Sequence, residues 1–161
     1  MGRTFLIVVL AAALAVPATL SAATATDGTL SVKRGRGTIV LKFKGTAIGR
    51  LANGRVRITD KTPFDEQSPQ FRHCRRLLYP TLSTTVCIGR YISFRALDGR
   101  YVVRVQGSGI YLSAVGRGTV MVDGVGDQGV PDGVMSIDDS PYESLPDFPT
   151  TFDLGTSPTR R

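Results

Sequence analysis

The sequence has no tryptophan, one histidine (His73) and only two cysteines (Cys74 and Cys87) among 161 residues. Two cysteines and one histidine supply at most three zinc ligands, and the side chains of adjacent residues do not easily face one ion, so a zinc site has little support. A hydrolase that pairs a nucleophile with a histidine base has His73 as its only candidate base. Eighteen glycines without a three-residue period exclude collagen and indicate a chain rich in turns.

Residues 1–25 have the composition of a signal peptide. Arg3 is followed by an apolar run over residues 5–16, and Ala23-Thr24-Ala25 forms a cleavage pattern of small residues. A membrane anchor is the alternative, but a spanning helix needs about 20 apolar residues, and Pro17 ends this run too early. We therefore predict cleavage before Thr26, no membrane-spanning segment in the mature chain, and a protein that is secreted, extracellular or associated with the cell envelope.

Export changes the interpretation of the two cysteines, because disulfides persist in oxidising compartments. A bridge between Cys74 and Cys87 would close a short loop and contribute about 3 kcal/mol of stability. Unpaired reactive thiols and a metal site that includes His73 are the alternatives. The disulfide is the prediction.

The mature chain is predicted to be all-β. Ile39, Leu41 and Phe43 alternate with polar neighbours over residues 38–44, and residues 100–106 repeat this alternation. Glycines recur every eight or nine residues, which suits short antiparallel strands in a sandwich or barrel, with a short β-solenoid as the alternative. Asn53-Gly54 and Asp98-Gly99 fit tight hairpin turns.

Residues 30–55 align without gaps on residues 92–117, with eight identities in 26 positions, which indicates an internal duplication. We expect one domain over residues 26–155 and a polar tail over residues 156–161. Residues 61–90 form a proline-containing excursion that holds both cysteines, with a weak helix signal over residues 71–79. Further strands are predicted over residues 134–137 and 150–154. The proline-rich segment 141–155 is predicted to be an irregular lid or an edge strand.

Two stretches carry a resemblance: the glycine-punctuated run over residues 107–118, and Pro141-Tyr-Glu-Ser-Leu-Pro-Asp147 together with Thr150-Thr-Phe152. In these stretches the chain resembles a group of uncharacterised exported proteins from high-GC actinobacteria. The resemblance implies secretion and an all-β fold. It implies no activity and supplies no catalytic residues.

Charge is unevenly distributed, since residues 28–104 hold 16 basic and four acidic residues. An outward basic sheet face could bind anionic cell-wall polymers or another anionic envelope surface. An ordinary solvated sheet surface, partly neutralised by the acidic C-terminal half, is the alternative. Nucleic acid is not expected, because the aromatic residues of these strands face inward. The candidate polyanion-binding residues are Lys42, Arg55, Arg57, Arg95 and Arg104.

Carboxylates offer two weaker hypotheses. Asp123, Asp127 and Asp132 lie among glycines and are weak calcium candidates for an extracellular structural or adhesive module. Their spacing fits neither the twelve-residue helix–loop–helix pattern nor a tandem glycine–aspartate repeat. Asp138, Asp139 and Glu143 could serve a carboxylate-dependent hydrolase, but any acidic surface offers as much. We predict a non-catalytic protein without a cofactor. The sequence leaves its ligand and oligomeric state open.

Overall fold

The computed structural model describes residues 26–64 and 68–155, and the predicted signal peptide and polar tail lie outside these residues. The described chain is all-β, as predicted, with seven strands in one antiparallel sheet and no helix. Two of the strands are very long and five are short. The strands are β1 (Gly28–Asp60), β2 (Gln70–Arg72), β3 (Arg76–Thr81), β4 (Thr84–Gly124), β5 (Val134–Ile137), β6 (Glu143–Ser144) and β7 (Thr150–Leu154).

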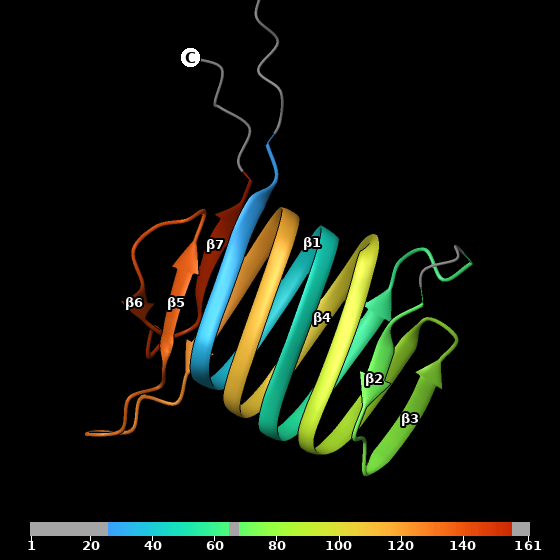
Figure 1. Ribbon diagram of the computed structural model, residues 1–161, viewed down its shortest axis with the longest axis horizontal. Coiled ribbons are helices and arrows are strands. Elements are labelled where there is room, and N and C mark those ends of the chain that lie inside the picture. Colours follow the sequence, from blue (N-terminus) through green and yellow to red (C-terminus); the bar gives the residue numbers. More distant parts are fainter. Residues whose placement is uncertain (1–25, 65–67, 156–161) are drawn as a thin grey trace, which may run out of the picture.

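The long strands β1 and β4 run antiparallel and wind together as a flattened coil (Figure 1). Leu41 of β1, for example, pairs with Val103 along one edge and with Val120, 17 residues further along β4, along its other edge. One turn of the coil therefore takes about 17 residues of each strand. Sheet pairing continues from turn to turn without closing into a barrel. The two flattened sides face each other like the layers of a sandwich.

Glycines stand where the coil bends from one layer to the other. At Gly54 the backbone has φ +142°, and an added Cβ would lie 2.1 Å from the carbonyl oxygen of Gln106. Because β1 continues through this position, the predicted hairpin at Asn53-Gly54 is wrong, and so is the one at Asp98-Gly99, which lies within β4. Paired glycines form two ladders: Gly28–Gly116–Gly45–Gly99 at one bend and Gly124–Gly37–Gly107–Gly54–Gly89 at the other.

The glycine ladders divide the coil into two layers, named here by their segments. Layer A contains residues 38–44, 55–59, 84–88, 100–106 and 117–123, extended by β3 and β7. Layer B contains residues 29–36, 46–53, 90–98 and 108–115, extended by β2 and β5. The segments 30–55 and 92–117 thus lie within β1 and β4 respectively, and each contributes to both layers. Their origin by duplication stays a prediction.

The core fills the space between the two layers. Ile39, Leu41, Val103 and Val105 are fully buried, and Tyr101 is 1% exposed. Their neighbours in the chain point outward, so the predicted alternation of buried and exposed positions is confirmed. Burial of these apolar side chains, at about 25 cal/mol per Å², is the main force that holds the layers together.

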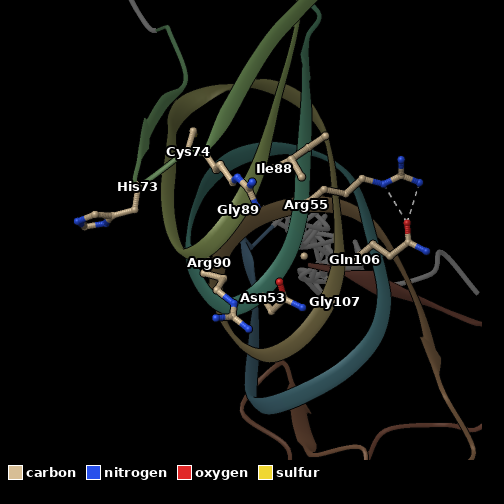
Figure 2. Close-up of a pocket in the computed structure, with 11 residues that line it drawn as sticks. Asn53, Arg55, His73, Cys74, Ile88, Gly89, Arg90, Gln106 and Gly107 are labelled. Carbon is tan, nitrogen blue, oxygen red and sulfur yellow. Dashed lines mark hydrogen bonds between the residues drawn. The ribbon is translucent and has the colours of Figure 1, made fainter.

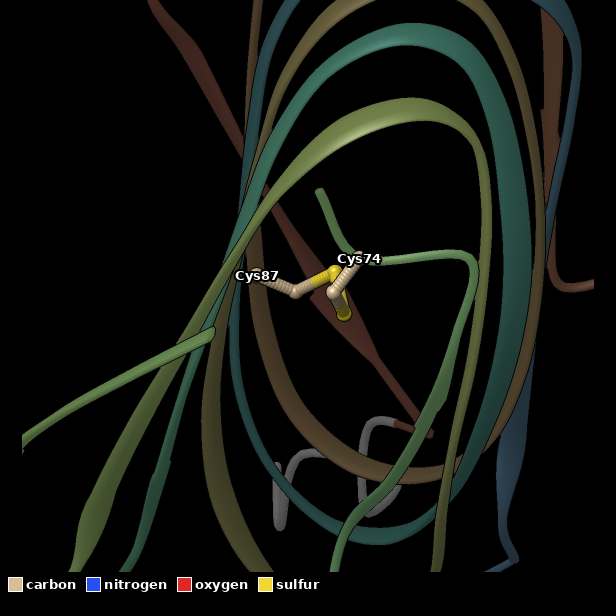
Figure 3. Close-up of a disulfide and its surroundings, with 2 residues drawn as sticks. All are labelled: Cys74 and Cys87. Carbon is tan, nitrogen blue, oxygen red and sulfur yellow. A yellow bond between two sulfur atoms is a disulfide. The ribbon is translucent and has the colours of Figure 1, made fainter. Parts of the chain in front are cut away.

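The two ends of the coil are built differently. At one end, the segment between the long strands supplies β2, β3 and the predicted disulfide, which joins Cys74 to Cys87. Figure 3 shows this bridge inside the oval outline of the coil, and Cys87 belongs to the buried core. The helix expected over residues 71–79 is wrong, because β2 and β3 occupy part of this range.

At the other end, the C-terminal strands cover the core. β5 and β7 have the bounds predicted for residues 134–137 and 150–154, and β7 is an edge strand paired with β4. Met135, Leu145 and Leu154 bury their side chains there. The first and last described residues lie close together at this end (Figure 1).

Candidate functional site

The outer surface of layer A carries a dense group of cations, which we call the basic face. These side chains occupy the outward positions of the alternating pattern, opposite the buried residues of the same strands, and all of them are exposed. The basic face consists of Lys42, Lys44, Arg55, Arg57, Arg100 and Arg104.

Sheet register places several of these cations directly opposite one another. Lys44 pairs with Arg100 on one side and with Arg117 on the other, and Arg57 pairs with Arg104. Side chains opposite each other in an antiparallel sheet have Cβ atoms about 5 Å apart, and like charges in such pairs destabilise the sheet. The fold therefore tolerates two repulsive cross-strand pairs within the basic face, Lys44 with Arg100 and Arg57 with Arg104. Arg117, outside the basic face, forms an ion pair with Asp27.

Acidic side chains of the described residues form no ion pair with the basic face. The ion pairs found within residues 26–64 and 68–155 join Arg36 to Asp127 and Asp132, and Arg117 to Asp27. None of these pairs includes a member of the basic face. The acidic C-terminal half therefore forms its ion pairs with Arg36, which lies outside the basic face.

Three arginines of the basic face surround a small hollow. Arg55, Arg57 and Arg104 line a space of about 100 Å³ above Val86. Arginine presents several N–H donors in a planar group, which suits phosphate, sulfate and carboxylate oxygens. The hollow has room for one such anionic group at a time.

A larger pocket, of about 850 Å³, lies beside this hollow at the bend that contains Gly54, Gly89 and Gly107. Arg55 belongs to both spaces, and its guanidinium donates two hydrogen bonds to Gln106 Oε1, at 3.1 and 2.9 Å (Figure 2). The polar and charged side chains that line the pocket are neutral or basic: Asn53, Arg55, His73, Arg75, Arg90 and Gln106. The group of exposed basic side chains therefore extends from layer A around the bend.

The structure brings together four of the five predicted polyanion-binding residues and separates the fifth. Arg95 pairs with Ile48 and Gln70 and lies on layer B, because the bend at Gly99 separates it from Arg104. Arg95 therefore lies apart from the basic face, and its part in polyanion binding stays a prediction. The sequence analysis did not name Lys44 and Arg100. Their positions could have been found, because each lies two or four residues from a named candidate on the same strand and so faces the same side of the sheet.

The calcium candidates serve other contacts. Arg36 binds Asp127 through its guanidinium and lies 4.0 Å from Asp132 Oδ1, and Asp132 Oδ2 accepts a 2.6 Å hydrogen bond from the Gly126 backbone N–H. Asp123 stands apart on β4, opposite Thr38. No group of three His, Cys, Asp or Glu side chains within the described ranges could hold a metal ion.

The carboxylates considered for hydrolysis bind the start of β1. Asp138 Oδ1 accepts a 2.9 Å hydrogen bond from the Thr29 backbone N–H, and Asp139 Oδ1 accepts one of 3.1 Å from the Thr29 hydroxyl. Glu143 is an exposed residue of β6. Both aspartates thus hold the turn after β5 against β1.

Across residues 26–64 and 68–155 there is no helix long and apolar enough to cross a membrane. The resemblance to exported actinobacterial proteins stays a prediction. Comparison with protein-family models, with curated proteins and with solved structures found no match to this chain.

Proposed function

We propose that this chain is an exported, non-catalytic binding module that holds anionic cell-envelope polymers on its basic face. The observation that carries the proposal is the like-charged register of Lys44 with Arg100 and of Arg57 with Arg104, without an acidic partner among the described residues. Such pairs cost stability in the free protein, and a bound polyanion would remove that cost.

The shape of the basic face suits a polymer better than a small substrate. Its cations extend over three adjacent segments of layer A, 38–44, 55–59 and 100–106, and continue into the pocket at the bend. A chain of phosphate, sulfate or carboxylate groups can contact several of these cations at once, and each contact adds to the affinity.

Nucleic acid fits this surface less well, because Phe43 and Tyr101 face the core and leave no aromatic side chain among the six cations for base stacking. The disulfide supports an oxidising compartment, where anionic wall polymers are found and nucleic acid is scarce. Secretion or attachment to the cell envelope therefore belongs to the same proposal.

The test is co-sedimentation of the mature protein with envelope material from its own source over a series of salt concentrations. Polyphosphate, polyglutamate and heparin serve as defined probes with phosphate, carboxylate and sulfate groups. We expect retention at low salt and its loss at a few tenths molar salt, because the screening length falls from about 10 Å at 0.1 M to about 3 Å at 1 M.

A matched pair of variants separates the basic face from net charge. Lys42→Glu with Arg104→Glu reverses two charges on layer A, and Arg50→Glu with Arg95→Glu reverses two on layer B. The first variant should lose retention and the second should keep most of it. Equal retention of wild type and the layer A variant would refute the proposal.

A further inference from the structure

A second surface with different chemistry lies at the end of the coil formed by β2 and β3. The β3–β4 hairpin carries Leu77, Leu78, Tyr79 and Leu82 with exposed fractions of 41, 42, 68 and 97%. Every residue of β3 is exposed. Isolated apolar residues are common on surfaces, but a cluster of this size on one hairpin marks an interaction site.

A further exposed aromatic side chain lies in the loop that follows β1. Phe64, 94% exposed, follows the end of β1, and the backbone N–H of Asp60 donates a 2.7 Å hydrogen bond to the carbonyl of Ser83 at the hairpin turn. Figure 1 shows the described part of this loop and the hairpin at the end of the coil opposite β5 and β7.

Within residues 68–97, which include the hairpin, every charged side chain is basic. Asp60, whose backbone binds the hairpin turn, is buried, and its carboxylate accepts a hydrogen bond from the Thr62 backbone N–H. Residues 68–97 contain no aspartate or glutamate, and Arg72, Arg75 and Arg76 are exposed on or beside β2 and β3. Apolar side chains next to cations are the composition of surfaces that bind anionic lipid bilayers, where each Lys or Arg near the headgroups contributes about 1 kcal/mol.

We infer that the β3–β4 hairpin inserts into the surface of an anionic lipid bilayer, with Leu82 and Tyr79 leading. Leu82, at the hairpin turn, is 97% exposed, so a fluid acyl layer can surround it on nearly all sides. Tyr79 is 68% exposed and, with Leu77, also lines a hollow of about 680 Å³ beside β2, which an acyl chain can enter. Tyrosine favours the boundary between headgroups and acyl chains.

A second copy of the chain fits the hairpin less well than a bilayer does. Pro80 removes a backbone donor from the edge strand β3, which limits pairing with another strand. Two copies that met at β3 would also bring Arg75 and Arg76 of both chains together without acidic partners in residues 68–97. Anionic headgroups supply the complementary charge.

Vesicle flotation tests the inference, with vesicles of phosphatidylcholine alone and of phosphatidylcholine with phosphatidylglycerol in equal parts. Wild type should float only with the anionic vesicles. Replacing the two leading residues, Leu82→Ser with Tyr79→Ser, should lower partitioning by at least about tenfold, because each side chain loses its burial in the acyl region. Both side chains are exposed, so the fold should be unaffected.

The absence of native tryptophan allows insertion to be measured directly. Leu82→Trp should give an emission spectrum that shifts to the blue with anionic vesicles and is quenched by brominated lipid. Phe148→Trp is the matched control: Phe148 is 77% exposed and lies in the loop before β7, at the opposite end of the coil, so its emission should not change.

Other outcomes would overturn the inference. They are failure of the wild type to float, flotation of the Leu82/Tyr79 variant at the wild-type level, and unshifted emission from the Leu82→Trp variant on bound vesicles.

A protein that inserts into vesicles but binds no polyanion would refute the proposed function alone. If the Lys42/Arg104 variant, whose hairpin is unchanged, failed to float, lipid binding would belong to the basic face. Insertion of the hairpin would then be refuted.

Discussion

Arg57 of β1 lies directly opposite Arg104 of β4, and both side chains line the same hollow on the outside of layer A. No acidic side chain of residues 26–64 and 68–155 forms an ion pair with either one. Repulsion between these two arginines lowers the stability of the free protein, whereas the proposed polyanion binding needs both positive charges.

Replacing Arg57 with glutamate should stabilise the free protein and weaken polyanion binding. The change turns a repulsive cross-strand pair into an attractive one, which is worth about 0.2–1 kcal/mol. Urea unfolding measures the first effect and retention on heparin the second. Ser113→Glu, on the exposed outside of layer B, adds a negative charge and should change heparin retention much less. A less stable Arg57→Glu variant would contradict the account of this pair.

The disulfide should make a large contribution to stability. Cys74 and Cys87 are 13 residues apart, and the chain-entropy model gives about 3 kcal/mol for a loop of this length. Cys74→Ala with Cys87→Ala should therefore lower the urea midpoint of the protein. Reductant should lower the midpoint of the wild type in the same direction and leave that of the double variant unchanged. A midpoint that neither treatment moves would show that β2 and β3 hold this end without the bridge.

The bends should not accept side chains. Gly107→Ala would place a Cβ 2.0 Å from the carbonyl oxygen of Asn53, at φ +153°, and should cost more than about 2 kcal/mol. Gly129→Ala is the control, because Gly129 also has a positive φ, +77°, but has no atom within 4 Å of the added Cβ. It should cost about 1 kcal/mol from backbone strain alone. Similar unfolding free energies for the two variants would show that crowding at the ladder is unimportant.

Tyr142 should titrate below the ordinary tyrosine pKa of 10.0, first because Lys33 hydrogen-bonds to its oxygen and then because Ser31 does, at 2.8 Å. The folded pKa is the lower one, so ionised Tyr142 favours the folded state at pH values above 10.0, and this contribution disappears as the pH falls through the lowered pKa. The absorbance difference between wild type and Tyr142→Phe measures the titration. Lys33→Gln should move the pKa upward, and Lys42→Gln should not.

The sequence predicted which side chains face the core, but it did not predict which layer each strand segment joins. Alternation of Ile39, Leu41 and Phe43 depends only on the two-residue repeat of a strand, so it was confirmed. Assigning Arg95 correctly requires knowing that Gly99 bends a continuing strand. A glycine in a bend and a glycine in a hairpin turn are alike in sequence, because both relieve steric restriction of the backbone.

The pocket and the hairpin surface were beyond prediction for a similar reason. The hairpin residues, and His73, Cys74 and Arg75 of the pocket, come from the segment between the long strands, where prolines and mixed polarity hide the two-residue repeat. Arg75 and Arg55 line the same pocket only because β3 pairs with the first turn of β4, which pairs in turn with β1. Register between distant strands depends on the packed core and is weakly encoded in any local window.

The coil also determines how the molecule can come apart. Its strands are joined at the disulfide end, and both described chain ends lie at the other end, so tension between these ends acts first on the outermost pairs such as Gly28–Gly116. Most of β1 is paired along both edges. A turn of strand that separates from the coil must therefore also rotate about the axis of the turns that are still paired. Resistance to pulling in this protein therefore includes resistance to torque.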